Sequence, residues 1–321
     1  MNLQTKIPLK SQQHNQIDYH SKLLLIGSCF VENMGEKLNY FKFQTLQNPF
    51  GILFHPQAIA SFITHAINGK VYTDKDVFFQ NEQWHCFEAH SHLSNPNKEA
   101  LLKTLNSQIQ LTSEKLKSSS HIIITLGTAW IYRFLETNSA VANCHKVSQN
   151  KFLKELLSVE EVSQSLEVIV NSIKSVNQDA TIVFTVSPVR HLKDGFVENT
   201  QSKAHLIAAI HQLLNQKSEI VNLQSYYFPS YELMMDELRD YRFYAEDMIH
   251  PNQTAINYIW EKFKEVWISE KASHVMEEVD AIQKGLQHKP FNPNSESHKL
   301  FLQKLQERQE KLQTHFLHIS F

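Results

Sequence analysis

The chain has 321 residues, 42% of them hydrophobic and 20% charged, so it is long enough to bury a full core. Its 31 Lys and Arg residues nearly balance 33 Asp and Glu residues. A formal net charge of -2 argues against a nucleic acid or an anionic membrane as the partner. The start of the chain lacks the apolar run of a secretory signal peptide, and no stretch reaches the roughly 18 apolar residues that span a bilayer. We therefore expect a globular cytoplasmic protein that acts on a small molecule.

Three segments predict buried parallel strands, namely residues 22–27, 121–127 and 181–187. Each is an apolar, β-rich run that ends in Gly or Ser. A weaker fourth strand is predicted at 219–224. Helical periodicity is found at residues 32–38, 162–175, 202–214 and 254–267. This alternation predicts an α/β fold with a doubly wound, flavodoxin-like, mostly parallel sheet flanked by helices.

Two regions depart from this alternation. Residues 70–100 predict short strands or an irregular insertion. From about residue 270 the chain is charged and periodic, which predicts C-terminal helices interrupted at residues 288–298. These helices either pack on the outside of the domain or form a coiled contact with a partner. We therefore predict a main domain over residues 1–270 and a helical extension over 271–321.

The loops that follow the predicted strands begin at Gly27, Gly127 and Ser187, and in such a sheet these loops border the ligand crevice. Directly after the first strand stand Ser28 and Cys29, in "LLLIGSCFVENMG". A helix that starts there would supply backbone N–H groups for an oxyanion and lower the pKa of a thiol. The structural alternatives are an ordinary N-cap for Ser28 and a buried small side chain for Cys29.

A second pattern, Asp247-x-x-His250-Pro251, stands before the helical segment at 254–267. Proline biases His250 away from helical dihedrals, and its ring fits the first position of the following helix. On such a loop the Asp247 carboxylate can bond one imidazole nitrogen and leave the other free to take a proton, as in a catalytic triad. A capping aspartate beside a surface histidine would give the same spacing.

The order of several motifs resembles the GSCFA family and, more distantly, the SGNH (GDSL-type) hydrolase superfamily. The motifs are "GSCF", "NPFG", "LGTAW", "NCHK", "SPVRH" and "DMIHP". The superfamily pattern Gly-Asp-Ser-x-x-Glu-x-x-Gly aligns with Gly27, Glu32 and Gly35, which implies Cys29 as nucleophile with Ser28 at the aspartate position. A shift of one residue at the turn would favour Ser28 instead. The last superfamily motif implies that Asp247 and His250 complete the triad.

The resemblance also implies an oxyanion site in which the backbone N–H of Gly51 joins that of the nucleophile. The asparagine of the third superfamily motif is missing, because residues 127–130 read Gly-Thr-Ala-Trp. Loss of one such donor costs about 2.7–4 kcal/mol of transition-state stabilisation, so Asn48, Thr128 or another group would have to substitute. Structural roles for Asn48 and Thr128 are equally open.

The remaining candidates are substrate-binding side chains. Arg190 and His191 follow the strand at 181–187, and Arg190 could clamp a carboxylate or phosphate or form a structural ion pair. His90 and His145 are candidates for the pocket wall. A zinc site could draw on His85, Cys86, His90, His92, Cys144 and His145, but no paired metal-ligand spacing appears, and we predict no metal or organic cofactor. Three cysteines without paired spacing predict free thiols.

Together these features lead us to expect an acyl-ester hydrolase or acyltransferase with a Cys or Ser nucleophile. Its substrate would be a small-molecule ester or an O-acylated carbohydrate. A non-catalytic glycan- or peptide-binding module on a degenerate scaffold is the alternative, and a metal-dependent hydrolase is the third class considered. The sequence leaves open the substrate, the acyl acceptor and the oligomeric state.

Overall fold

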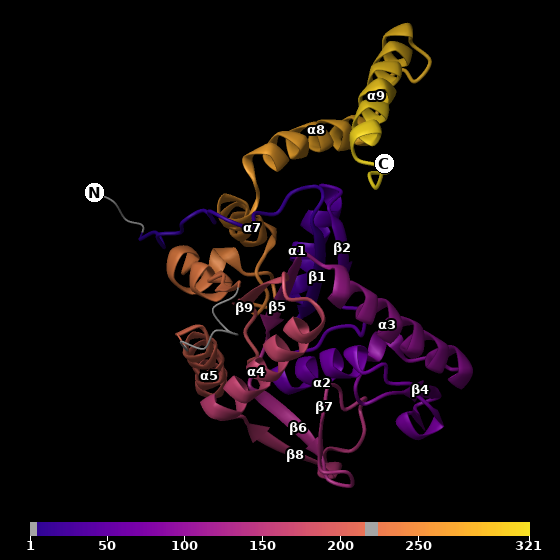
Figure 1. Ribbon diagram of the computed structural model, residues 1–321. Helices are drawn as coiled ribbons and strands as arrows, with labels where there is room; N and C mark the ends of the chain where they lie inside the picture. Colours follow the sequence, from indigo (N-terminus) through magenta and orange to yellow (C-terminus); the bar gives the residue numbers. More distant parts are fainter. Residues whose placement is uncertain (1–4, 216–223) are drawn as a thin grey trace.

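The computed structural model describes residues 5–215 and 224–321. Its centre is a five-stranded parallel sheet in the order β10-β9-β5-β1-β2. Its strands are β1 (Lys22–Gly27), β2 (Gln44–Gln47), β5 (His121–Leu126), β9 (Thr181–Val186) and β10 (Ser225–Tyr227). The strands β9, β5, β1 and β2 are labelled in Figure 1. Counted in chain order from the β2 edge, the sheet reads 2-1-3-4-5, which is a doubly wound order. The predicted fold class is confirmed, whereas the fourth strand predicted at 219–224 lies, except for its last residue, outside the described residues.

Alternating side chains of the central strands pack on opposite faces of the sheet, which buries it on both sides. In β1, Leu24 and Ile26 belong to one core cluster, while Leu23 and Leu25 belong to a second. The first cluster is covered by α2 (Pro56–Ile67), α3 (Lys98–Ser118), α4 (Val159–Val176) and α5 (Phe196–Asn215). The second is covered by α1 (Phe30–Tyr40), by the π-helical stretch Leu233–Leu238 that follows the short α6 (Ser230–Glu232), and by α7 (Gln253–Trp267). Helices α1, α4, α5 and α7 were predicted, whereas α2 and α3 were not.

Two small antiparallel sheets lie beside the central one. The predicted insertion contains a hairpin of β3 (Phe78–Gln80) and β4 (Gln83–His85). A three-stranded sheet, which the sequence did not predict, has the order β7-β6-β8 and consists of β6 (Trp130–Phe134), β7 (Ser139–Val141) and β8 (Phe152–Leu156). Because β6 begins four residues after β5 ends, this sheet starts at the carboxyl edge of the central sheet.

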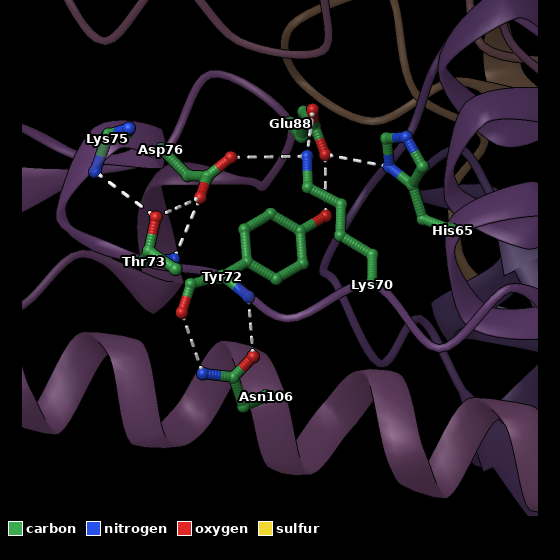
Figure 2. Close-up of polar contacts among 8 residues, drawn as sticks. All are labelled: His65, Lys70, Tyr72, Thr73, Lys75, Asp76, Glu88 and Asn106. Atoms are coloured by element: carbon green, nitrogen blue, oxygen red, sulfur yellow. Dashed lines mark hydrogen bonds and ion pairs between the residues drawn. The ribbon is translucent and has the colours of Figure 1, made fainter.

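A cluster of polar side chains around Glu88 fastens the insertion to the helices beneath it (Figure 2). The Glu88 carboxylate accepts hydrogen bonds from His65 Nδ1 at 3.0 Å, Lys70 Nζ at 2.8 Å and the Tyr72 hydroxyl at 2.6 Å. The main chain of Tyr72 also exchanges two hydrogen bonds with the Asn106 side chain of α3. Segments that are separate along the chain are therefore joined through one carboxylate.

The C-terminal region forms two helices, α8 (Glu270–Gln287) and α9 (Glu296–His315), as predicted. They extend away from the central sheet (Figure 1). Leu305 and Leu312 of α9 belong to the second core cluster, and the ring of Phe316 lies 5.1 Å from that of Tyr19. The end of the chain is thereby attached to its beginning. Among the residues that the structure describes, no helix has both the length and the apolar character needed to cross a bilayer.

Candidate functional site

The turn after β1 requires glycine at position 27. Gly27 has φ +144°, and a Cβ built there would lie 2.1 Å from the carbonyl oxygen of Thr125 on the neighbouring strand. The next amide, that of Ser28, donates to the same carbonyl at 3.0 Å. No side chain can be accommodated at such a distance, so the close pairing of β1 and β5 fixes where the following residues lie.

This turn separates the two nucleophile candidates. Ser28 is fully buried and its Oγ has no hydrogen-bond partner among the described residues. Cys29, in the N-cap position of α1, is half-buried and lines a cavity of about 660 Å³. Only the thiol of this pair is therefore in contact with a space that can hold a substrate.

The cavity lies beyond the carboxyl ends of the central strands, where a doubly wound sheet binds ligands. Its walls come from the segments that follow β1, β5 and β9, from the strands of the small sheet, and from the loop before α7. The lining residues are Cys29, Ile52, Phe54, His55, Thr128, Trp130, Tyr132, Val141, Ala142, Asn143, Cys144, Gln149, Val189, Arg190, His191, Leu192, Lys193, Asp194, Ile249 and His250. Cys29 and His250, which are far apart in the sequence, thus border the same space.

Opposing influences act on the Cys29 thiol. Burial raises its pKa above the usual value and Glu32 adds to this, whereas Lys203 and the backbone N–H groups of Cys29 and Phe30 act in the opposite direction. The net effect is a raised pKa, so the resting side chain is a neutral thiol. A nucleophilic role would therefore require a nearby base.

The Asp247 and His250 side chains form the pair that the sequence predicted. His250 Nδ1 lies 2.6 Å from Asp247 Oδ2, and Asp247 Oδ1 accepts the backbone N–H groups of Ile249 and His250 at 2.9 Å each. The backbone and side-chain hydrogen bonds from His250, with that from Ile249, lower the pKa of Asp247 to about 2. The carboxylate is therefore ionised at neutral pH, and it holds the imidazole with Nδ1 protonated and Nε2 as the proton acceptor.

The prediction that Pro251 opens the following helix was wrong. Pro251 forms a β-bridge with Tyr244, and α7 begins only at Gln253. Asn252 is the cap, because its side chain accepts a hydrogen bond from Ala255 N at 3.1 Å. An Asn side chain at this position satisfies a free amide of the first turn, which a proline ring cannot do.

Arg190 links the loop after β9 to the loop that carries His250. Its guanidinium donates to the Met248 carbonyl and lies over the rings of Tyr241 and Tyr244, 5.3 and 4.5 Å from their centroids. Its Nε is buried without a partner among the described residues. Arg190 thus joins the loop after β9 to the histidine loop, and its Nε is covered by protein atoms.

His191 is a neutral side chain in the same wall. Burial, with smaller contributions from Lys203 and His250, lowers its pKa to about 3. Its ring meets Phe54 edge to face at 5.5 Å, and its Nε2 is buried without a partner among the described residues. The ring can accept or donate one hydrogen bond but is not a cation at neutral pH.

The predicted oxyanion residues are only partly brought to the cavity. Thr128 lines it, but its hydroxyl already pairs with Ser202 at 3.0 Å and accepts the Trp130 amide. Asn48 supports the turn instead, because its Oδ1 accepts the Gly27 amide at 2.9 Å. The Gly51 amide donates to the Asn48 carbonyl at 2.7 Å and Gly51 does not line the cavity. Gly51 is thus part of a turn at φ +74°, and its N–H is not available as an oxyanion donor.

His90 and His145 do not line the cavity either. His90 pairs with the ring of His92 at 3.0 Å, and the buried His145 lies 2.7 Å from the Cys86 carbonyl. Burial lowers the pKa of His145 to about 4, which keeps the ring neutral. Over the described part of the chain, no three His, Cys, Asp or Glu side chains are grouped so that they could hold a metal ion. Cys29, Cys86 and Cys144 are free thiols, as predicted.

Sequence reasoning missed Lys203, which lies 1% exposed behind the cavity wall. It stands on the buried face of α5 with Ser202, Leu206 and Ile210. A lysine at an apolar position of an amphipathic helix was the signal that could have identified it, since buried lysines are rare unless paired.

The fold and the site together describe a doubly wound α/β protein with a thiol and an aspartate-supported histidine at the carboxyl edge of its sheet. The GSCFA family profile matches residues 22–263, and the profile described as "GSCFA domain protein, C-terminal domain" matches residues 279–321. The chain therefore belongs to the GSCFA family. No curated protein matches it.

Proposed function

We propose that this protein is an SGNH-like acyl-ester hydrolase or acyltransferase with Cys29 as its nucleophile. The observation that carries the proposal is that Cys29 and His250 line one cavity while Asp247 holds the His250 ring. A nucleophile, a base and a group that orients the base are the three parts that acyl transfer needs.

In the proposed reaction His250 Nε2 removes the thiol proton as Cys29 Sγ attacks the ester carbonyl. The tetrahedral intermediate collapses to a thioester on Cys29, and the proton held by His250 goes to the leaving alcohol. Water, or an acceptor alcohol, then gives its proton to His250 and attacks the thioester. Collapse of this second intermediate releases the acid or the new ester, and the proton returns to the Cys29 sulfur.

Two features of the site support the handling of charge in these steps. The backbone N–H groups of Cys29 and Phe30 stabilise a negative charge at the sulfur, and they stand at the amino terminus of α1. In enzymes with a strand-nucleophile-helix turn, the backbone N–H of the residue after the nucleophile forms part of the oxyanion hole. Asp247, ionised at neutral pH, stabilises the imidazolium that forms during each proton transfer.

The composition of the cavity wall supports an O-acylated carbohydrate as the substrate class. The rings of Phe54, Trp130 and Tyr132 line the cavity together with the amides of Asn143 and Gln149. Aromatic faces can pack on the C–H faces of a sugar, and a few polar groups can fix the orientation of its hydroxyls.

The test compares Cys29→Ala, His250→Ala, Ser28→Ala and Cys86→Ser with the wild type on p-nitrophenyl acetate and on acetylated sugars. We expect losses of about 10³-fold in kcat/KM for Cys29→Ala and His250→Ala. Ser28→Ala and Cys86→Ser, which alter buried side chains outside the cavity, should stay within a few-fold of wild type. Full activity after loss of His250 would contradict the proposal, and activity lost only with Ser28→Ala would move the nucleophile to that residue.

A second candidate, a non-catalytic glycan-binding module, is favoured by the raised pKa of the Cys29 thiol and by the missing third-motif asparagine. Under this alternative the wild type turns over none of the esters. Isothermal titration with acetylated oligosaccharides would then give the same affinity for wild type and Cys29→Ala, and a lower affinity for Trp130→Ala.

A further inference from the structure

Lys203 connects two strand ends behind the site. Its Nζ donates to the carbonyl of Gly127 at 2.6 Å and to that of Ser187 at 2.8 Å. Gly127 directly follows β5 and Ser187 directly follows β9, so the ammonium group lies at the carboxyl edge of the sheet, on the side where the cavity opens. Within the described residues these are its two hydrogen bonds, whereas an ammonium carries three donors.

Cys29 stands two residues beyond the end of β1, and Lys203 Nζ is bonded to the carbonyl that directly follows β5, the neighbour of β1 in the sheet, so both groups lie at the same edge of adjacent strands. Glu32 on α1 raises the thiol pKa, and Lys203 on α5 lowers it. The influence is mutual, since burial lowers the pKa of Lys203 and the charge of Cys29 acts against that lowering. His191 and His250 also face this region, and besides burial the positive charges of Lys203 and His250 lower the pKa of His191, which stays neutral.

We propose that Lys203 is the buried counter-ion of Cys29, and that its ammonium stabilises the negative charge that forms on the sulfur as His250 takes the thiol proton. The two strand-end carbonyls hold Nζ in place, so the charge is positioned before any substrate binds. When Cys29 loses its proton, the pair becomes an ammonium and a thiolate in a medium of low polarity, where opposite charges interact strongly. The inference rests on the proposed function in one respect, namely that Cys29 is the nucleophile.

A purely structural role for Lys203 would produce different results, and Lys174 provides the matched control. Lys174 is also buried, 8% exposed, and its Nζ donates to the carbonyls of Gln178 at 2.8 Å and Ala180 at 2.7 Å. Ala180 precedes β9, so this lysine bridges carbonyls at the opposite edge of the sheet from Cys29. Lys174→Met therefore removes the same chemistry without removing a charge near the thiol.

The experiment measures the rate of Cys29 alkylation by iodoacetamide as a function of pH, with the modified peptide quantified by mass spectrometry. We expect Lys203→Met to raise the pH midpoint of the alkylation rate by at least about one pH unit. A shift of this size makes the reaction at neutral pH about tenfold slower. Lys174→Met should leave the midpoint unchanged, and Lys203→Arg, which keeps the charge, should restore it. A folded Lys203→Met protein with the wild-type midpoint would overturn the inference.

If Lys203→Met fails to fold, the reciprocal measurement decides. The ¹³Cε signal of Lys203 is titrated in wild type and in Cys29→Asp, which places a carboxylate at the position of the thiol, and we expect a higher midpoint in Cys29→Asp. Equal midpoints would overturn the inference. Neither measurement requires ester turnover, so a shifted thiol midpoint without hydrolysis would refute only the proposed function. Hydrolysis that depends on Cys29 and His250, with unshifted midpoints, would refute only the role of Lys203.

Discussion

Replacing Glu88 by Gln would test the cluster that fastens the insertion to the helices (Figure 2). Although burial raises the pKa of Glu88, hydrogen bonds from His65, Lys70 and Tyr72 hold it at about 2, against an ordinary value of 4.5. At about 1.4 kcal/mol per pKa unit, this difference sets an upper limit of about 3.5 kcal/mol. The side chain is 35% exposed, and solvent screening reduces the expected loss of unfolding free energy to about 1–2 kcal/mol.

The same reasoning fixes the pH dependence of this contribution. Because the folded-state pKa is depressed, the stabilisation is fully present above about pH 5 and is lost as the pH falls toward 2. Urea unfolding followed by circular dichroism should show the full difference in unfolding free energy between wild type and Glu88→Gln at pH 7. At pH 3 this difference should be less than half as large. Glu155→Gln is the control, because Glu155 has a similar exposure but forms a single ion pair, with Arg133 at 2.7 Å. This variant should lose less than about 1 kcal/mol of unfolding free energy. Equal stability of Glu88→Gln and wild type at pH 7, or a gap unchanged at pH 3, would refute the reasoning.

Two further predictions concern the site. Gly27→Ala should prevent correct pairing of β1 with β5, because the added methyl group would lie 2.1 Å from the Thr125 carbonyl. The purified variant should be misfolded or should melt far below the wild-type temperature. A wild-type melting curve would contradict this prediction. Asp247→Asn should keep the fold but lower kcat on an ester substrate by about 10²–10⁴-fold with little change in KM. The reason is that the neutral amide does not stabilise the His250 imidazolium as the carboxylate does. An unchanged kcat would show that the pair plays no part in turnover.

The central strands could be predicted from sequence because burial on both faces leaves a plain signal. The strands β1, β5 and β9 are continuous apolar runs, each followed by a short polar or glycine turn. The strand β2 was missed because its sequence, Gln-Thr-Leu-Gln, is mostly polar and lies half-buried at the edge of the sheet. The sheet of β6, β7 and β8 was missed because its short strands mix exposed and buried positions, and their pairing depends on contacts that a local pattern does not contain.

The candidate site was predictable where chemistry is local in sequence and not where it depends on tertiary contacts. Asp247 and His250 are three residues apart, so one loop fixes their hydrogen bond. Gly51 was assigned by alignment to a motif, yet its amide is bonded within its own turn. Lys203 reaches the site only because α5 packs on the sheet so that the lysine Nζ bonds the carbonyls after β5 and β9, and nothing near it in the sequence marks it as a neighbour of Cys29.

The structure also gives a physical reason for the choice between Ser28 and Cys29. Moving the chain by one residue to bring Ser28 to the cavity would place Ile26 where Gly27 now meets the Thr125 carbonyl. A Cβ at position 27 lies 2.1 Å from the Thr125 carbonyl oxygen, so the Cβ of Ile26 would clash with that oxygen. The Ile26 side chain would also leave the core cluster to which it now belongs. Because side chains alternate along a strand, the same shift would turn every residue of β1 to the wrong face. The glycine at the end of the strand therefore sets the register of the turn and assigns the cavity position to the thiol.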